Sequence, residues 1–324
     1  MSNPSRRYRR AAKILFLGVD GGGTKTQTVV YSADGEKLSE DTAGPSNPLR
    51  IGLRPSADTI FESATRACDR IARTTGGIAA CVAGLAGVRR EDLRDGMRRL
   101  IGERLPGADV SVVTDAEIAL LAATGGKPGI VVIAGTGSIV FGRNSKGRSA
   151  LAGGWGPIAG DEGGAVSIAR EALRAVARAS DGRGPKTVLS ALAAEYFRAS
   201  SAEDLIVAIY SPQMNYTRLA GFARHVAEAA TEGDDVAATI VRDAGKDLGA
   251  AACAVIRRLR MERSNLRIGT VGGVFGAGDL VRRPLLRIVR SCAAKARIVE
   301  PVTSPAEAAA ALAISQFKGK QVTL

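Results

Sequence analysis

The residues best suited to do chemistry appear early, in the glycine-rich turn Asp20-Gly21-Gly22-Gly23-Thr24-Lys25-Thr26. Successive glycines let the backbone turn tightly and expose a row of N–H groups, which form a nest for phosphate oxygens. The threonine hydroxyls add donors, and Asp20 could hold Mg²⁺ directly or through water. The turn is neither a P-loop nor a dinucleotide fingerprint, because the required spacing is missing and a strand follows it. Alone, it is equally consistent with a plain glycine hairpin.

Two later turns share this character. Gly135-Thr136-Gly137-Ser138 again offers glycine N–H groups and a threonine hydroxyl. Together with the first turn it predicts two facing hairpins that hold the β- and γ-phosphates of a nucleotide from both sides. Gly272-Gly273-Val274-Phe275-Gly276 could let a flat adenine approach the backbone. As a single motif it is also consistent with an ordinary connection from a strand to a helix.

Asp115 directly follows the apolar run 110–113 and precedes a helical stretch. Its plain interpretation is a helix N-cap. Its functional interpretation is a general base, because phosphoryl transfer to a sugar hydroxyl needs a carboxylate that orients the hydroxyl and accepts its proton. The position between two phosphate-binding turns favours the base.

The densest motif is the loop Gly153-Gly154-Trp155-Gly156-Pro157-Ile158-Ala159-Gly160-Asp161-Glu162-Gly163-Gly164, which holds the only tryptophan. So many glycines exclude a strand or helix interior. We expect Asp161 to cap the following helix and also to accept hydrogen bonds from sugar hydroxyls.

Composition narrows the function further. The chain has 324 residues, a net charge of +13 and a pI near 10.1, which favours anionic ligands such as nucleotides. One histidine and four scattered cysteines exclude multi-histidine and C-x-x-C metal sites. The low aromatic content, 4 %, argues against base stacking on nucleic acid.

Residues 1–13, with five basic and no acidic residues, are expected to be a flexible leader. Because no apolar run reaches the roughly 20 residues of a membrane span, we expect a cytoplasmic protein without membrane contact.

Hydrophobic periodicity predicts an α/β fold. We expect strands at 14–19, 26–31, 36–42, 78–83, 110–113, 130–133, 139–141, 267–271 and 296–299. We expect helices at 57–73, 91–105, 117–123, 161–179, 186–197, 218–230, 236–260 and 305–317. The repeated strand–turn–strand unit predicts two lobes, at 14–125 and 126–304, followed by a C-terminal segment at 305–324.

These motifs, in this order, resemble the BadF/BadG/BcrA/BcrD-type ATPase family, and within it the N-acetylglucosamine kinases. The resemblance covers residues 14–317. It implies the actin-like ATPase fold, with two ribonuclease-H-like lobes, ATP and Mg²⁺ in the cleft between them, and the last helix packed on the first lobe.

The resemblance also implies residue roles. Asp115 is implied to be the catalytic base, and Asp20, from its place at the end of the first strand, is the residue expected to hold the metal. ATP contacts are implied for Gly21, Gly22, Gly23, Thr24, Lys25, Gly135, Thr136, Gly137, Gly272 and Gly273. Sugar contacts are implied for Asn47, Gly154, Trp155, Gly156 and Asp161. The expected reaction is transfer of the γ-phosphate to the 6-hydroxyl of N-acetylglucosamine, with a homodimer as the assembly to test.

Two departures keep alternatives open. Ile139 stands where the N-acetylglucosamine pattern has Asn, and Pro48-Leu49 stands where His-Trp is common. Both affect sugar recognition, so a glucosamine kinase is the first alternative. An ATPase activator of an acyl-CoA dehydratase or reductase is the second, although no cysteine pair stands ready to hold a cluster. A DNA-bound sugar sensor is disfavoured, because thirteen leader residues leave no room for a helix-turn-helix.

Overall fold

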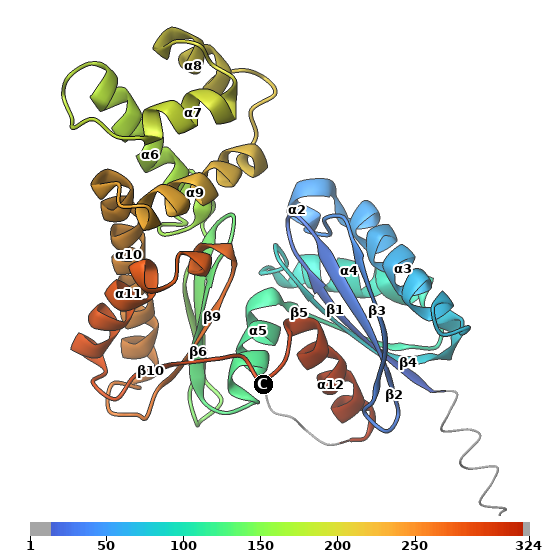
Figure 1. Cartoon of the computed structure of the whole chain (residues 1–324). Coiled ribbons are helices and arrows are strands. Elements are labelled where there is room, and N and C mark those ends of the chain that lie inside the picture. The colour runs from blue at the N-terminus through green and yellow to red at the C-terminus, as the bar shows by residue number, and fades with distance from the viewer. Residues whose placement is uncertain (1–13, 320–324) are drawn as a thin grey trace, which may run out of the picture. The chain divides into compact units, whose positions relative to one another are not determined.

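The computed structural model describes residues 14–319, and the basic leader expected at 1–13 lies outside this range. The chain forms two compact units (Figure 1). Of the described residues, the first unit comprises 14–127 together with 301–319, and the second comprises Pro128–Glu300. The first unit is therefore built from two separate stretches of the chain.

The first unit contains a five-stranded sheet in the order β3-β2-β1-β4-β5. Its strands are β1 (Leu15–Gly21), β2 (Thr26–Ser32), β3 (Lys37–Ala43), β4 (Ile78–Leu85) and β5 (Asp109–Thr114). The strands β1, β2 and β3 form an antiparallel meander, whereas β1, β4 and β5 run parallel. The carboxyl ends of three parallel strands therefore meet at one edge, where ligands bind in open α/β sheets.

Alternating side chains give this sheet two apolar faces. Leu15, Leu17 and Val19 of β1 pack with α3 (Leu53–Asp69) and α4 (Glu91–Arg104). Phe16 packs on the opposite face with α5 (Asp115–Thr124) and α12 (Pro305–Phe317). Two short elements, α2 (Pro48–Ile51) and the 3₁₀ turn η1 (Thr75–Gly77), complete the unit. Both faces are covered, as a sheet containing parallel strands requires.

The C-terminal helix α12 lies unusually close to β1. A Cβ atom at Gly18 would lie 2.1 Å from the carbonyl oxygen of Ala306 and 2.4 Å from the amide nitrogen of Ala310. Only glycine leaves room for this approach, which returns the end of the chain to the first sheet.

The second unit repeats the topology with the strand order β10-β9-β6-β7-β8. Its strands are β6 (Gly129–Ala134), β7 (Ser138–Arg143), β8 (Ser149–Gly153), β9 (Arg267–Val271) and β10 (Arg297–Val299). Again a three-stranded antiparallel meander is extended by two parallel strands on the side of its first strand. Both sheets therefore have the ribonuclease-H-like arrangement, and the expected α/β fold of two such lobes is confirmed.

Helices make up most of the rest of the second unit (Figure 1). They are α6 (Ala165–Ser180), α7 (Leu189–Phe197), α8 (Ala202–Ile209), α9 (Tyr216–Thr231), α10 (Asp235–Leu259), α11 (Asp279–Cys292) and the 3₁₀ turn η2 (Gly273–Ala277). In α10, Gly245 and Gly249 bring the backbone of α11 into contact, because a Cβ atom at either would lie within 3.0 Å of a carbonyl oxygen of α11. The long buried helix α10 is thus the central support of this unit's core.

The sequence interpretation missed several elements. It gave no element for α2, α8, β8 or α11, and it began the helix after the tryptophan loop at 161 rather than at Ala165. Helix α11 contains Pro284 in its interior, which usually ends a helix, and four arginines. Its strong apolar stripe against α10 outweighs that local preference, so tertiary packing decides this element.

Candidate active site

The edge of the first sheet brings two of the expected carboxylates together. Asp20, Gly84 and Val113 lie side by side across the parallel strands β1, β4 and β5. Asp115 follows Val113 by two residues, at the first position of α5. Asp20 and Asp115 therefore leave the same edge of one sheet and are separated by a single strand, β4.

Helix α5 is capped by Thr114 and not by Asp115. The Thr114 hydroxyl accepts from the Glu117 N–H, and the Glu117 carboxylate accepts from both the Thr114 N–H (2.6 Å) and the Thr114 hydroxyl (2.8 Å). This reciprocal capping box satisfies the helix start. The N-cap interpretation of Asp115 is therefore wrong, and the helix does not need this carboxylate as a cap.

The environment of Asp115 suits a base that works near neutral pH. Its carboxylate accepts one hydrogen bond from the Ala116 N–H (2.9 Å). Burial raises its pKa to about 6, with a further upward contribution from the Glu117 charge. A general base is most effective when its pKa lies near the working pH. The group can therefore be ionised at pH 7 and still take up a proton readily.

Asp20 is the second buried carboxylate of this edge. Burial and the charge of Asp115 raise its pKa to about 6, although the Lys25 ammonium acts in the opposite direction. Within residues 14–319 no hydrogen bond or ion pair to its carboxylate is found. A desolvated carboxylate without a protein donor fits a hard cation such as Mg²⁺, which binds through one or two carboxylates and keeps several waters.

The first glycine turn is held in a fixed shape by its surroundings. The Gly22 N–H donates to the Lys25 carbonyl (2.9 Å), and the Ser46 N–H donates to the Gly22 carbonyl (3.1 Å). The Thr26 hydroxyl lies inside this structure, where it donates to the Gly44 carbonyl (2.7 Å) and shares a second hydrogen bond with the Ser46 hydroxyl (2.7 Å). The sequence pattern predicted the Thr26 hydroxyl to be a donor to a ligand. Thr26 is fully buried and does not offer its hydroxyl to a ligand, whereas Thr24 and Lys25 are exposed.

Asn47 lies beside this turn. Its side-chain oxygen accepts from the Leu49 N–H (3.0 Å) and caps the short helix α2. A Cβ atom at Gly87, just after β4, would lie 2.2 Å from the same oxygen. Gly87 has φ +84°, so glycine is required here for its backbone as well as for space. Asn47 is thus fixed at the sheet edge from which Asp20 and Asp115 emerge.

The second glycine turn is fastened to the start of α6. The first two N–H groups of this helix, from Ala165 and Val166, donate to the carbonyls of Gly135 (2.9 Å) and Thr136 (3.1 Å). Gly272, at the end of β9, packs against the same turn, because a Cβ atom there would lie 2.2 Å from the Ala134 carbonyl oxygen. The turns expected to bind phosphate and adenosine are therefore neighbours within the second unit.

Asp161 does not cap α6, contrary to expectation. The N-cap is Gly164, which has no side chain to offer. Asp161 instead has φ +61° and a buried side chain, and its carboxylate accepts from the Gly156 N–H (3.2 Å). Burial raises its pKa despite hydrogen bonds from the backbone N–H groups of Gly156 and Ser138. Trp155 directly precedes the segment closed by this contact, and 71 % of its surface is exposed.

The expected site residues therefore fall into two groups. The first unit brings together Asp20, Gly21, Gly22, Gly23, Thr24, Lys25, Asn47 and Asp115. The second brings together Gly135, Thr136, Gly137, Gly154, Trp155, Gly156, Asp161, Gly272 and Gly273. The sequence interpretation missed the supporting residues Thr114, Glu117 and Gly87. The T-x-x-E spacing of Thr114 and Glu117 is a capping-box signal that could have identified the first two.

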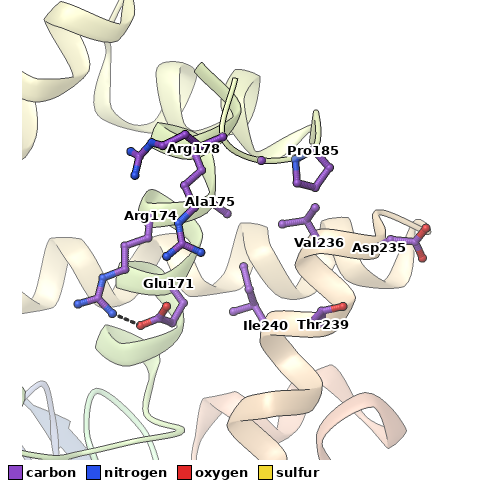
Figure 2. A pocket seen from close by; sticks show the side chains of 11 residues that line it. Glu171, Arg174, Ala175, Arg178, Pro185, Asp235, Val236, Thr239 and Ile240 are labelled. Atoms are coloured by element: carbon purple, nitrogen blue, oxygen red, sulfur yellow. Dashed lines mark hydrogen bonds and ion pairs between the residues drawn. The ribbon is translucent and has the colours of Figure 1, made fainter. Parts of the chain in front are cut away.

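A cavity of about 440 Å³ lies elsewhere in the second unit, between α6, the following loop and the start of α10 (Figure 2). None of the expected site residues lines it. Its Arg174 is paired with Glu171 (Figure 2), so this surface is less basic than its composition suggests.

Within residues 14–319 there is no cluster of three or more potential metal ligands. Over the same range, no helix is long and apolar enough to cross a bilayer.

Comparisons with known proteins agree with the topology. The chain is 34 % identical over 259 residues to the N-acetylmuramic acid/N-acetylglucosamine kinase of Clostridium acetobutylicum, covering 80 % of this chain and 85 % of that one. It is 30 % identical over 321 residues to the N-acetyl-D-glucosamine kinase of Dictyostelium discoideum, covering 95 % and 100 %. A crystal structure from Chromobacterium violaceum, described as a candidate N-acetylglucosamine kinase, superposes with a TM-score of 0.77 at 27 % identity, covering 93 % and 99 %. The model of the BadF/BadG/BcrA/BcrD ATPase family matches residues 17–313, and the chain belongs to this family.

Proposed function

We propose that this chain is an ATP-dependent amino-sugar kinase that transfers the γ-phosphate to the 6-hydroxyl of N-acetylglucosamine. Membership of an ATPase family supports the use of ATP. The names of the relatives from Clostridium acetobutylicum and Dictyostelium discoideum support the sugar class.

The observation that carries the proposal is the state of Asp115. Because Thr114 and Glu117 cap α5, the Asp115 carboxylate is left for chemistry at the edge of the sheet. Its pKa, raised to about 6, suits a base that must be ionised at neutral pH and still accept a proton. A purely structural N-cap would not have this combination.

In the proposed reaction, Asp115 accepts the proton of the sugar 6-hydroxyl as that oxygen attacks the γ-phosphorus. A new phosphorus–oxygen bond forms, the bond to the β-phosphate oxygen breaks, and ADP leaves with the electron pair. Asn47 would orient the sugar. Its side-chain oxygen already accepts from Leu49, so its amide NH₂ is the group offered to a sugar oxygen.

The two glycine turns would bind the phosphates, with backbone N–H groups and the Thr24 and Thr136 hydroxyls as donors. Lys25 would add a positive charge, and Gly272 with Gly273 would accommodate the adenosine. Asp20 would hold Mg²⁺, whose charge offsets that of the phosphate oxygens. The loop from Gly154 to Asp161 would complete the sugar site.

A coupled assay of ADP release tests the function. The panel should contain N-acetylglucosamine, N-acetylmuramic acid, glucosamine and glucose, each at the same concentration. Release that depends on N-acetylglucosamine supports the proposal, and release that depends only on glucosamine supports the first alternative. N-acetylglucosamine and glucosamine are both included because the apolar Ile139 packs against Gly154 of the proposed sugar loop, where a Cβ atom would lie 2.9 Å from the Ile139 side chain.

ADP release without any sugar would instead support an ATPase activator. Such a protein needs accessible cysteines to hold an iron–sulfur cluster. Cys68, Cys81 and Cys253 are buried, and Cys292 lies on α11, so their positions give no support to that alternative. We also propose a cytoplasmic location and a homodimer, and light scattering on the purified protein would test the assembly.

A further inference from the structure

Asp161 is an unusual residue among those of the second unit. Only 8 % of its surface is exposed, and its φ of +61° is a backbone conformation that glycine adopts freely and that other residues adopt at a cost, which is smallest for Asn and Asp. A strained, buried aspartate persists only when its contacts compensate for the strain.

Those contacts join two separate segments. The Asp161 carboxylate accepts from the N–H of Gly156 (3.2 Å), in the tryptophan loop, and the N–H of Ser138, at the end of the glycine turn, helps to stabilise its charge and lowers its pKa. The Asp161 carbonyl accepts from the Gly164 N–H (2.9 Å), and the Ser138 hydroxyl donates to the carbonyl of Glu162 (2.6 Å). A single side chain thus connects the loop expected to bind sugar with the turn expected to bind phosphate.

The second glycine of that turn, Gly137, packs directly on the carboxylate. A Cβ atom at Gly137 would lie 2.0 Å from Oδ2 of Asp161, and its three nearest neighbours would all be atoms of Asp161. The glycine is therefore needed at this position because Asp161 occupies the space that a side chain would fill.

We propose that Asp161 is a positioning residue that fastens the loop at 154–160 to the turn at 135–138, so that it controls the affinity for ATP even when no sugar is bound. This inference deepens the proposed function and rests on it for the identity of the two ligands. Hydrogen bonds to a carboxylate are stronger than those between neutral groups, and here they hold both segments in one arrangement. Without them, the turn loses the preorganisation that makes its N–H groups a good phosphate site.

The test measures binding of the non-hydrolysable analogue adenylyl imidodiphosphate by calorimetry, with Mg²⁺ and without sugar. Asp161→Gly removes the carboxylate while allowing the positive φ, and it should weaken binding about tenfold, the usual worth of a hydrogen bond to a charged group. Asp161→Asn tolerates the same φ and can still accept one hydrogen bond, so it should weaken binding by about threefold. Asp243→Asn removes an exposed carboxylate of α10 in the same unit, which pairs with Lys246 (2.7 Å), and it should leave the affinity unchanged.

A double-mutant cycle with Gly137→Ala isolates the contact itself. Alone, Gly137→Ala forces the new methyl group against Asp161 and should weaken binding by about tenfold or more. In the Asp161→Gly background the clashing atoms are absent, so the same change should weaken binding by less than about threefold. Melting curves of all variants show whether each is folded. If Asp161→Gly is not, the cycle is repeated with Asp161→Ala, which also removes Cγ and Oδ2, the two atoms nearest to the new methyl group.

Three results would overturn the inference. The first is an Asp161→Gly protein whose affinity for the analogue is unchanged and whose KM for the sugar alone is raised. The second is a double-mutant cycle in which the effects of the two substitutions on analogue affinity simply add. The third is a parent protein that does not bind the analogue. Failure of the proposed function is a separate outcome, because it would appear as a parent that binds the analogue but phosphorylates no amino sugar.

Discussion

Asp20 and Asp115 leave one edge of the first sheet on either side of β4, and the charge of Asp115 contributes to the raised pKa of Asp20. Two carboxylates kept close together in a partly dehydrated site cost stability, since each would be more stable ionised in water. The capping box of Thr114 and Glu117 fixes the start of α5, and with it Asp115, without a hydrogen bond between the Asp115 carboxylate and the cap. In the proposed reaction both carboxylates have a use, Asp115 as the base and Asp20 as the metal ligand.

Replacing the proposed base is the first test. Asp115→Asn should lower kcat for sugar phosphorylation by roughly 10²–10⁴-fold, because an amide cannot accept the hydroxyl proton. Asp109→Asn removes an exposed carboxylate from the other end of β5 and serves as the matched control. Steady-state kinetics of both variants give the comparison, and a turnover of Asp115→Asn within a few-fold of the parent would contradict the assignment.

The same variant should gain stability. The folded pKa of Asp115 is raised to about 6 from 3.8, so the folded state binds the proton more tightly than the unfolded state. Its contribution to the free energy of unfolding therefore falls as pH rises from about 4 to about 6. Above pH 6, Asp115→Asn should be more stable than the parent, by up to about 3 kcal/mol. Melting curves at pH 5 and pH 8 check this, and the difference should be larger at pH 8.

The rate should also depend on pH in a defined direction. Asp115 must be ionised to act as a base, so kcat/KM should fall as the pH drops through about 6 and approach a plateau above it. Values of kcat/KM measured between pH 5 and pH 8.5 at constant ionic strength would show this fall on the acidic side of the profile. A profile flat down to pH 5 would mean that another group takes the proton.

Substitutions of Glu117 test whether the capping box that holds the start of α5 is needed to position Asp115. Glu117→Gln can keep the capping box, whereas Glu117→Ala removes it and should cost about 1 kcal/mol of stability. We expect Glu117→Ala to lower kcat several-fold with little change in the KM for ATP, and Glu117→Gln to retain most of the turnover. Equal losses of turnover in both variants would show that the charge of Glu117 matters more than its hydrogen bonds.

Trp155 tests the sugar loop. Its side chain is largely exposed, so Trp155→Ala should leave the melting temperature nearly unchanged. Loss of an aromatic contact with the sugar should raise the sugar KM about tenfold and the ATP KM much less. If only the ATP constant rises, the loop has been assigned to the wrong ligand.

The packing of α12 can be tested by paired glycine substitutions. Gly18→Ala places a methyl group 2.1 Å from the Ala306 carbonyl oxygen and should destabilise the protein by about 1–3 kcal/mol. Gly102→Ala, in the helix α4 with open space at its Cβ position, should instead stabilise it by about 0.5–1 kcal/mol. Urea unfolding of both proteins would reveal opposite signs, and similar behaviour of the two would contradict the close approach of α12.

The sequence alone determined the class of fold and the main motifs. The continuous apolar runs at 14–19 and 130–133 predict buried strands, and the glycine turns after them need little tertiary context because glycines so close together allow few other structures. The repeat of strand, turn and strand was sufficient to predict two similar lobes, and the identical topology of the two sheets confirms it.

Tertiary structure decided which polar group does which task. Thr114 and Asp115 are both good N-cap residues, and sequence preferences do not separate them, whereas the register of β5 against β4 places Thr114 at the cap. Asp161 precedes a helix and looked like a cap, but its positive φ turns the side chain toward Gly137 and Gly156. These outcomes depend on contacts between segments far apart in the chain, and local preferences, worth about 1 kcal/mol each, are too weak to resist them.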